Sequence, residues 1–308
     1  LACESIRRGE SAMAVAGGAM LIFSPQHSIA ESKGGFLSSD GLCKPFDVGA
    51  DGYVRGGGGG VVVLKPLKSA IVDRDPVHAV IRGSAVNQDG RTRGITVPSG
   101  RAQEHVTRTA YENAGMDTSV VGYMEAHGTG TAVGDPIELK SLGRVFGPGR
   151  TSPLVMGSCK ANIGHTEAAA GVAGVIKAAL CLSHRRIPPQ IHFHSPNPAV
   201  DFSALGLRIP IREELWPHRD GPVVAGVNAF GYGGTNAHLV LEAAPEIEPV
   251  QNPALFSPPF VLPLSAHNGK ALRQLAERLG ERLPATGDAS GVLSLCHTAG
   301  CRREHHDV

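Results

Sequence analysis

The stretch VGYMEAHGTGTAVGDPIELKSLGRVFG, residues 121–147, predicts a buried strand, a loop rich in glycine and threonine, and a helix in immediate succession. Asp135 is placed to cap the helix, and Pro136 suits its first turn because proline has no backbone N–H to donate. Loops at the carboxyl ends of strands are where α/β proteins place their active sites. This stretch therefore predicts the fold class and one functional loop.

Strands and helices alternate on both sides of that stretch, which predicts an α/β fold with a largely buried sheet. The nearly continuous apolar run at 11–23 is typical of a strand covered on both faces, whereas residues 24–60 are loop-rich. Gly115 is placed to end a helix. Further strands are expected within residues 60–71, 77–90, 153–160, 223–231 and 237–244, and helices within 1–11, 99–115 and 165–184.

The character of the chain changes at Pro245. Residues 245–260 are rich in proline and predict a linker, and 261–266 predict a short strand. Residues 269–283 predict an amphipathic helix, which should pack against another surface. Its apolar stripe consists of Leu272, Leu275, Leu279 and Leu283.

The charge balance bears on possible partners. There are 29 basic and 28 acidic residues, giving a formal net charge of +1. This balance argues against nucleic acid or a membrane surface as the main partner, although a local basic patch for an acidic carrier protein is compatible with it. The six cysteines are scattered, no signal peptide is evident, and no apolar run approaches the roughly 20 residues of a membrane span. We expect reduced thiols and a cytoplasmic location.

Both ends of the sequence suggest a piece of a longer chain. The first residue is Leu1 rather than Met, and residues 1–11 fit the second half of an amphipathic helix. The last residues, CRREHHDV, carry no boundary signal. We expect the chain to be a fragment of a larger polypeptide.

Two segments each offer a histidine beside a strand. In EAHGTGT, His127 follows a strand, with the hydroxyls of Thr129 and Thr131 close by. In SCKANIGHTEAAAG, Lys160 is expected to end a strand and His165 to begin a helix. The partial positive charge of a helix N-terminus disfavours the imidazolium, so His165 should be a neutral hydrogen-bond donor suited to a developing enolate. The simpler interpretation of His127 is a loop histidine whose hydrogen bonds are satisfied locally. The simpler interpretation of His165 is a histidine that caps a helix.

Glycine-rich turns form a third group of candidates. NAFGYGGTNAH places Tyr232 in a turn whose free backbone N–H groups could form an oxyanion hole, although an ordinary tight turn has the same pattern. This turn and the run Gly56–Gly60 both precede strands rather than helices. Neither is therefore a dinucleotide-binding motif.

Metal binding is an alternative that the residue types leave open. A metal-dependent hydrolase could use four side chains, although a lysine beside them would compete with the metal: His127, Asp135, His165 and His238. A C-terminal group fits no standard zinc spacing: Cys296, His297, Cys301, His305 and His306. We expect no metal.

Taken together and in this order, EAHGTGT, KANIGHTEAAAG and NAFGYGGTNAH resemble the ketosynthase (beta-ketoacyl synthase) domain of modular type I polyketide synthases. KPFDVGADGYVRG and NQDGRTRGITVPSG also fit that family. The resemblance implies a thiolase fold of two similar α/β halves. The end of the first half would be 1–76, all of the second half 77–244, and the start of a linker toward an acyltransferase domain 245–308.

The resemblance also implies a reaction, the decarboxylative Claisen condensation of an acyl thioester with a malonyl-type extender. The enzyme would be an acyltransferase of the 3-oxoacyl-[acyl-carrier-protein] synthase type. His127 and His165 would assist decarboxylation and stabilise the enolate, with Lys160 supporting the second histidine. Thr129 and Thr131 would lie near the phosphopantetheine arm, and Tyr232 would supply an oxyanion donor and a gate.

None of the six cysteines fits the nucleophile of the family, which is expected just upstream of Leu1. If another residue stands there, the domain would be a decarboxylating or non-condensing module that binds carrier protein. The chain also departs from the family where Arg55-Gly56-Gly57-Gly58 replaces the usual RGEG, which puts local order there in doubt.

The partners implied by the resemblance are an acyl carrier protein, an acyltransferase domain of the same polypeptide and a second copy in a homodimer. No cofactor is expected to bind directly, because the substrates are carried on the phosphopantetheine arm.

Overall fold

The computed structural model describes residues 1–94, 96–217, 221–246, 259–283, 289–301 and 303–308. The chain divides into two compact units, Leu1–Pro245 and Glu246–Val308, and each is described by itself. The division of the first unit at residue 76 stays a prediction.

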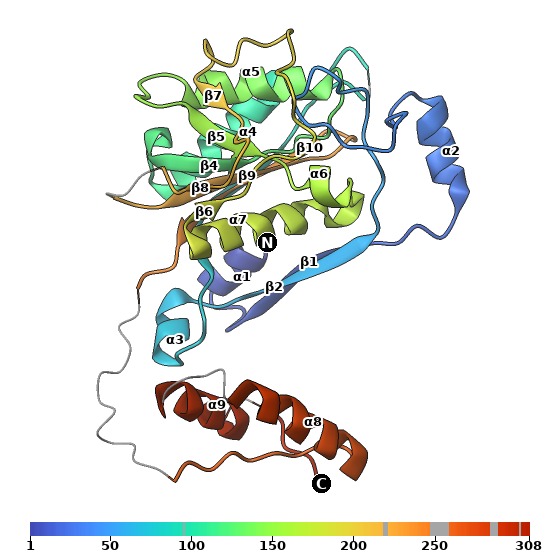
Figure 1. The fold of residues 1–308 in the computed structure, drawn as a ribbon. Coiled ribbons are helices and arrows are strands. Elements are labelled where there is room, and N and C mark those ends of the chain that lie inside the picture. The colour runs from blue at the N-terminus through green and yellow to red at the C-terminus, as the bar shows by residue number, and fades with distance from the viewer. Residues whose placement is uncertain (95, 218–220, 247–258, 284–288, 302) are drawn as a thin grey trace. The chain divides into compact units, whose positions relative to one another are not determined.

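A six-stranded sheet forms the centre of the larger unit, in the order β3-β10-β9-β4-β5-β7 (Figure 1). The strand β10 pairs antiparallel with both β3 and β9, whereas β9, β4, β5 and β7 run parallel to one another. The predicted α/β class is therefore confirmed. The strand bounds are Ala79–Gln88 for β3, Val121–Glu125 for β4, Leu154–Gly157 for β5, Leu207–Arg208 for β7, Val224–Phe230 for β9 and Thr235–Ala243 for β10.

Helices cover both faces of this sheet (Figure 1). On one face lie α4, Gly100–Ala114, and α5, Gly134–Phe146, whose apolar side chains pack into the larger core. Ser99 accepts a hydrogen bond from the N–H of Ala102 at the start of α4, and Gly115 ends it with a φ of 63°. The other face carries α7, Ala170–His184, which follows the 3-10 turn η2, Glu167–Ala169. The helices predicted at these places are confirmed.

A second, antiparallel sheet lies on the far side of α7 (Figure 1). Its strands are β1, Ala14–Met20, and β2, Gly58–Leu64. The prediction that β1 is covered on both faces is wrong. Although η2, α7 and α1 contact β1, the side chains of Val15, Val61 and Val63 on this sheet are 69%, 62% and 64% exposed among the described residues.

The remaining short elements surround these two sheets, and most were not predicted. The segment expected to be loop-rich contains a helix, α2, whose N-terminus Ser24 caps by accepting from the N–H of Gln26. The bounds are Ala2–Arg7 for α1, Pro25–Lys33 for α2, Leu67–Val72 for α3, Thr118–Val120 for η1, Lys160–Ile163 for α6, Arg186–Ile187 for β6 and Glu214–Leu215 for β8.

The smaller unit contains α8, Gly269–Arg282, and α9, Ala289–Cys301. Asn268 caps α8 by accepting from the N–H of Ala271, and the predicted leucines of its stripe are half-buried. The strand expected at 261–266 does not form. The proposed linker at 245–260 lies largely outside the described residues.

One stretch, Glu167–His184, is long and apolar enough to cross a membrane by length and composition alone. It consists of η2 and α7, which contact strands of both sheets. Core helices of soluble proteins meet the same criterion. We therefore interpret this stretch as a core helix.

Candidate active site

A buried carboxylate holds the loop that carries His127. The loop follows β4, and Glu138 on α5 faces it. The backbone N–H groups of His127 and Gly128 each donate to Glu138 over 2.8 Å, and the side-chain amide of Asn228 donates to the same carboxylate over 2.8 Å. Burial raises the pKa of Glu138 above its ordinary value, although these donors oppose the shift. The loop conformation therefore depends on a side chain 11 positions further along the chain.

The hydrogen bonding of His127 indicates which ring nitrogen is protonated. The backbone N–H of Phe230 on β9 lies 3.3 Å from Nδ1 of His127, so Nδ1 accepts. The neutral ring must then carry its proton on Nε2. The pKa of His127 lies well below its ordinary value, mainly because the ring is buried and further because of the charges of Lys160 and His165. His127 is thus a neutral Nε2–H donor.

His165 has the same arrangement. It lies between α6 and η2, and its Nδ1 accepts from the backbone N–H of Glu167 over 3.0 Å. The rings of His127 and His165 are 5.4 Å apart between centroids, in a T-shaped arrangement. Burial, followed by the charge of Lys160, lowers the pKa of His165 to about 3. The neutral state predicted for His165 is therefore present, but burial and a lysine account for it rather than a helix N-terminus.

Lys160 does not end a strand, contrary to the prediction. The strand β5 stops at Gly157, and Lys160 begins the single turn α6 because the chain bends at Ser158 and Cys159. Only 3% of Lys160 is exposed. Its charge acts on both histidines, as the pKa shifts of the two rings indicate.

Tyr53 and Arg55 support His165 from the segment before β2. The Tyr53 ring lies 5.2 Å from the His165 ring, and the backbone N–H of His165 donates to the carbonyl of Val54 over 2.6 Å. Arg55 donates to Glu167 through Nε over 2.5 Å and through Nη2 over 3.1 Å. No role was predicted for Tyr53 and Arg55, although both belong to the motif KPFDVGADGYVRG.

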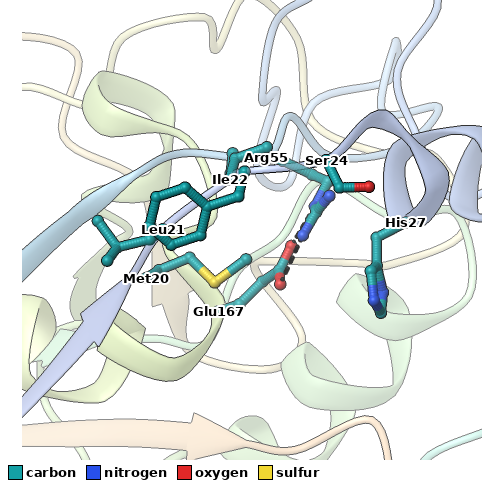
Figure 2. A pocket seen from close by; sticks show the side chains of 8 residues that line it. Met20, Leu21, Ile22, Ser24, His27, Arg55 and Glu167 are labelled. Atoms are coloured by element: carbon teal, nitrogen blue, oxygen red, sulfur yellow. Dashed lines mark hydrogen bonds and ion pairs between the residues drawn. The ribbon is translucent and has the colours of Figure 1, made fainter.

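The Arg55–Glu167 pair also lines a pocket of about 290 Å³ beside the end of β1 (Figure 2). The remaining lining is mostly apolar and runs from the last residue of β1 to the first turn of α2. It consists of Met20, Leu21, Ile22, Phe23, Ser24 and His27.

Asp135 serves the loop rather than the helix that it was expected to cap. The helix α5 begins at Gly134 without a side-chain cap, and Asp135 lies in its first turn. Its carboxylate accepts from the backbone N–H groups of Phe46, Gly130 and Thr131. Burial raises the pKa of Asp135 to about 7. Asp135 and Glu138 thus hold the two ends of one loop.

The two threonines of this loop lie side by side, with 3.1 Å between their Oγ1 atoms. Thr129 is buried, whereas Thr131 is half-buried and accepts from the backbone N–H of Gly134. Tyr232 lies in the turn between β9 and β10, and 74% of it is exposed. The predicted roles of Thr129 and Thr131 beside the phosphopantetheine arm, and of Tyr232 as an oxyanion donor and gate, remain proposals.

The four residues of the metal-hydrolase alternative do not form a metal site. His238 is fully buried on β10 and bonds Asn228 through Nδ1 at 2.6 Å, while Asp135 faces backbone amides. No group of three or more metal-binding side chains occurs among the residues that the structure describes. Within that range, the C-terminal cysteines and histidines form no such group either.

Comparison with known proteins identifies the family of this chain. The N-terminal domain of beta-ketoacyl synthases matches residues 1–70, and their C-terminal domain matches residues 78–194. The ketoacyl-synthetase C-terminal extension matches residues 196–306. The chain belongs to the beta-ketoacyl synthase family, as a ketosynthase portion of the polyketide synthase type with the thiolase fold.

The relatives are large synthases, of which the chain spans only a small part. The chain is 45% identical over 305 residues to a phenolphthiocerol/phthiocerol polyketide synthase of Mycobacterium tuberculosis, covering 98% of this chain and 16% of that protein. It is 48% identical over 309 residues to polyketide synthase GfsA of Streptomyces halstedii, covering 95% of this chain and 4% of that protein. The module 6 ketosynthase of the Bacillus subtilis bacillaene synthase matches with a TM-score of 0.89 and 39% identity, covering 99% of this chain and 53% of that structure.

Two neighbouring glycines should respond oppositely to alanine. A Cβ at Gly56 would lie 2.3 Å from the carbonyl oxygen of Ile163, beside His165, whereas a Cβ at Gly57 would meet only the carbonyl of Met20 at 3.6 Å. We expect Gly56→Ala to destabilise by about 1–3 kcal/mol through overpacking. Gly57→Ala should stabilise by about 0.4–1 kcal/mol by restricting the unfolded chain. Thermal unfolding of the two variants checks this, and equal shifts would contradict it.

Proposed function

We propose that this chain supplies the histidine pair and the lysine of a polyketide synthase ketosynthase. The reaction is the decarboxylative Claisen condensation of an acyl thioester with a malonyl-type extender. One observation carries the proposal: both active-site histidines accept a backbone N–H at Nδ1 and are held neutral. The centroids of the two rings are 5.4 Å apart, and each ring offers one Nε2–H donor. A pair of such donors suits an oxygen that gains negative charge.

The bond changes follow from this donor pair. The extender loses carbon dioxide when its Cα–carboxylate bond breaks, and the electron pair moves into an enolate whose oxygen accepts from the two histidines. The enolate carbon then attacks the acyl thioester carbonyl, and the carbon–sulfur bond breaks to release a thiolate. Neutral histidines donate to the enolate without delivering a proton that would quench it before attack.

The nucleophile of the acyl step is expected upstream of Leu1. Cys43, Cys159 and Cys181 are buried, and burial raises the pKa of Cys159 to about 12 and that of Cys181 to about 11. Such thiols form little of the reactive thiolate. Cys3 lies half-buried on α1, and Cys296 and Cys301 lie on α9 of the smaller unit.

Partners and location extend the same proposal. Both thioester substrates would arrive on the phosphopantetheine arm of an acyl carrier protein, near Thr129 and Thr131, with Tyr232 at the entrance. The intact polypeptide would carry an acyltransferase domain, form a homodimer and work in the cytoplasm. No directly bound cofactor is required.

The alternative function is a decarboxylating or non-condensing ketosynthase-like domain that binds carrier protein. The residue at the nucleophile position separates the two, so the natural transcript should be sequenced upstream of Leu1. The polypeptide should then be incubated with an acyl thioester and malonyl carrier protein while carbon dioxide and 3-oxoacyl product are measured. Both should appear if a cysteine stands there. Carbon dioxide without product would establish the alternative.

A further inference from the structure

An ion pair between a buried carboxylate and a half-buried lysine links elements that flank His127 and His165. Glu125 is the last residue of β4, two positions before His127, and its side chain is almost fully buried. Its Oε2 lies 2.9 Å from Nζ of Lys177. Lys177 belongs to α7, the helix that follows His165. The pair therefore connects the strand before one histidine with the helix after the other.

The other oxygen of Glu125 fixes the turn that carries Lys160. The backbone N–H of Cys159 donates to Oε1 of Glu125 over 2.7 Å, and Cys159 directly precedes α6. The hydroxyl of Tyr123 donates to Oε2 over 2.6 Å. Both oxygens of the carboxylate are thus engaged, one with the turn and the other with Lys177 and Tyr123.

The charge of Lys177 is maintained in this setting. Burial lowers the pKa of Lys177, but the Glu125 carboxylate more than offsets this effect, so the pKa lies above its ordinary value. Close packing of α7 makes the contact possible, since a Cβ at Gly174 would lie 3.3 Å from Cγ of Glu125. Removing one partner of a buried pair leaves an uncompensated charge, which rearranges or draws in water. The pair is therefore sensitive to loss of either member.

We propose that Glu125 and Lys177 are positioning residues that set the place of Lys160 relative to the two active-site histidines. They act through the Cys159 amide and the turn α6. The expected change in decarboxylation rate rests on the proposed function. The expected change in the protonation of the histidines does not rest on it.

A displacement of Lys160 should raise the pKa of both histidines. Besides burial, the charge of Lys160 lowers the pKa of both histidines. If the turn shifts and this charge withdraws, both pKa values rise, and the neutral donors begin to protonate at a higher pH. Other titratable or charged groups also face the histidine pair, and their positions should not change in this displacement. They are Tyr53, Arg55, Glu138 and Glu167.

Two variants separate the charge of the pair from its geometry. Lys177→Met leaves Glu125 buried and unpaired, so the carboxylate should leave the Cys159 amide. Combining Glu125→Gln with Lys177→Met removes both charges but keeps a side-chain oxygen that can accept from Cys159. The matched control is Arg208→Met, which removes one member of the Arg208–Glu214 pair, 2.6 Å long and outside the histidine site. We expect Lys177→Met to perturb the histidines, and the double variant and the control to leave them unperturbed.

The test measures histidine protonation directly in the intact polypeptide. Diethyl pyrocarbonate modifies the unprotonated imidazole, and mass spectrometry locates the product on the peptides of His127 and His165. In the wild type the reactive fraction of His165 should stay constant from pH 8 to pH 5, since its pKa is about 3. In Lys177→Met it should fall toward pH 5. The kcat for malonyl decarboxylation should also drop by between about tenfold and a hundredfold at little changed KM, with the acid limb moved to higher pH.

The outcomes distinguish the inference from the proposed function. If modification shifts in Lys177→Met but the wild type decarboxylates nothing, the positioning role stands and the proposed function fails. The inference is overturned if Lys177→Met keeps wild-type modification and pH profiles while only its melting temperature falls. It is also overturned if the double variant is as perturbed as the single one.

Discussion

Replacing His165 by alanine in the intact polypeptide should stop decarboxylation of the extender while leaving acyl loading of the nucleophile possible. The ring supplies one of two neutral Nε2–H donors, because Nδ1 is occupied by the N–H of Glu167. Loss of one such donor typically lowers the rate by about 10²- to 10³-fold. The measurement is release of labelled carbon dioxide from malonyl carrier protein, together with the fraction of enzyme that becomes acylated.

A suitable control is His184→Ala, which removes an exposed histidine at the end of α7. It should change neither reaction. Loss of acyl loading with survival of decarboxylation in His165→Ala would reverse the assigned role. Loss of both in an enzyme that still melts at the wild-type temperature would show that His165 serves the acyl step as well.

Local signals in the sequence were sufficient for the elements with a clear apolar pattern and clear ends. The helix α4 was predicted within residues 99–115 with Gly115 at its end, and Gly115 ends it as expected, whereas the cap by Ser99 was not predicted. The coverage of β1 could not be predicted in the same way. Its apolar run is compatible with two buried faces, but burial depends on which other elements pack against the strand. Among the described residues η2, α7 and α1 contact β1, and alternate side chains of the strand stay exposed.

In the candidate site, too, the sequence identified local motifs but not the contacts that depend on packing. His127, Lys160 and His165 were identified from their motifs, and the structure brings the two rings within 5.4 Å of each other. The role of Asp135 in holding the loop was not predicted, and Glu138 was missed altogether. Asp135 and Glu138 are three positions apart and therefore share a helix face, which was an available signal. That this face turns toward the loop rather than the solvent depends on the packing of α5, which the local sequence does not specify.

Glu138→Ala should be the most destabilising of these substitutions. The change would leave three donors without an acceptor: the backbone N–H groups of His127 and Gly128 and the amide of Asn228. Each buried donor left unsatisfied costs about 1–3 kcal/mol, so the total should be several kcal/mol unless water enters. Because protein stability is typically about 5–15 kcal/mol, this is a large fraction of it. Urea unfolding of the intact polypeptide measures the loss.

The control is Glu112→Ala, which removes an exposed glutamate on α4 and should change stability by no more than about 0.5 kcal/mol. Glu138→Gln should fall between the two variants, because a glutamine keeps one acceptor oxygen but turns an N–H₂ group toward one of the donors. The order Glu112→Ala, Glu138→Gln, Glu138→Ala in increasing loss is the expected result. If Glu138→Ala unfolded at the same urea concentration as Glu112→Ala, the loop of His127 would be held by its backbone and Asp135 alone.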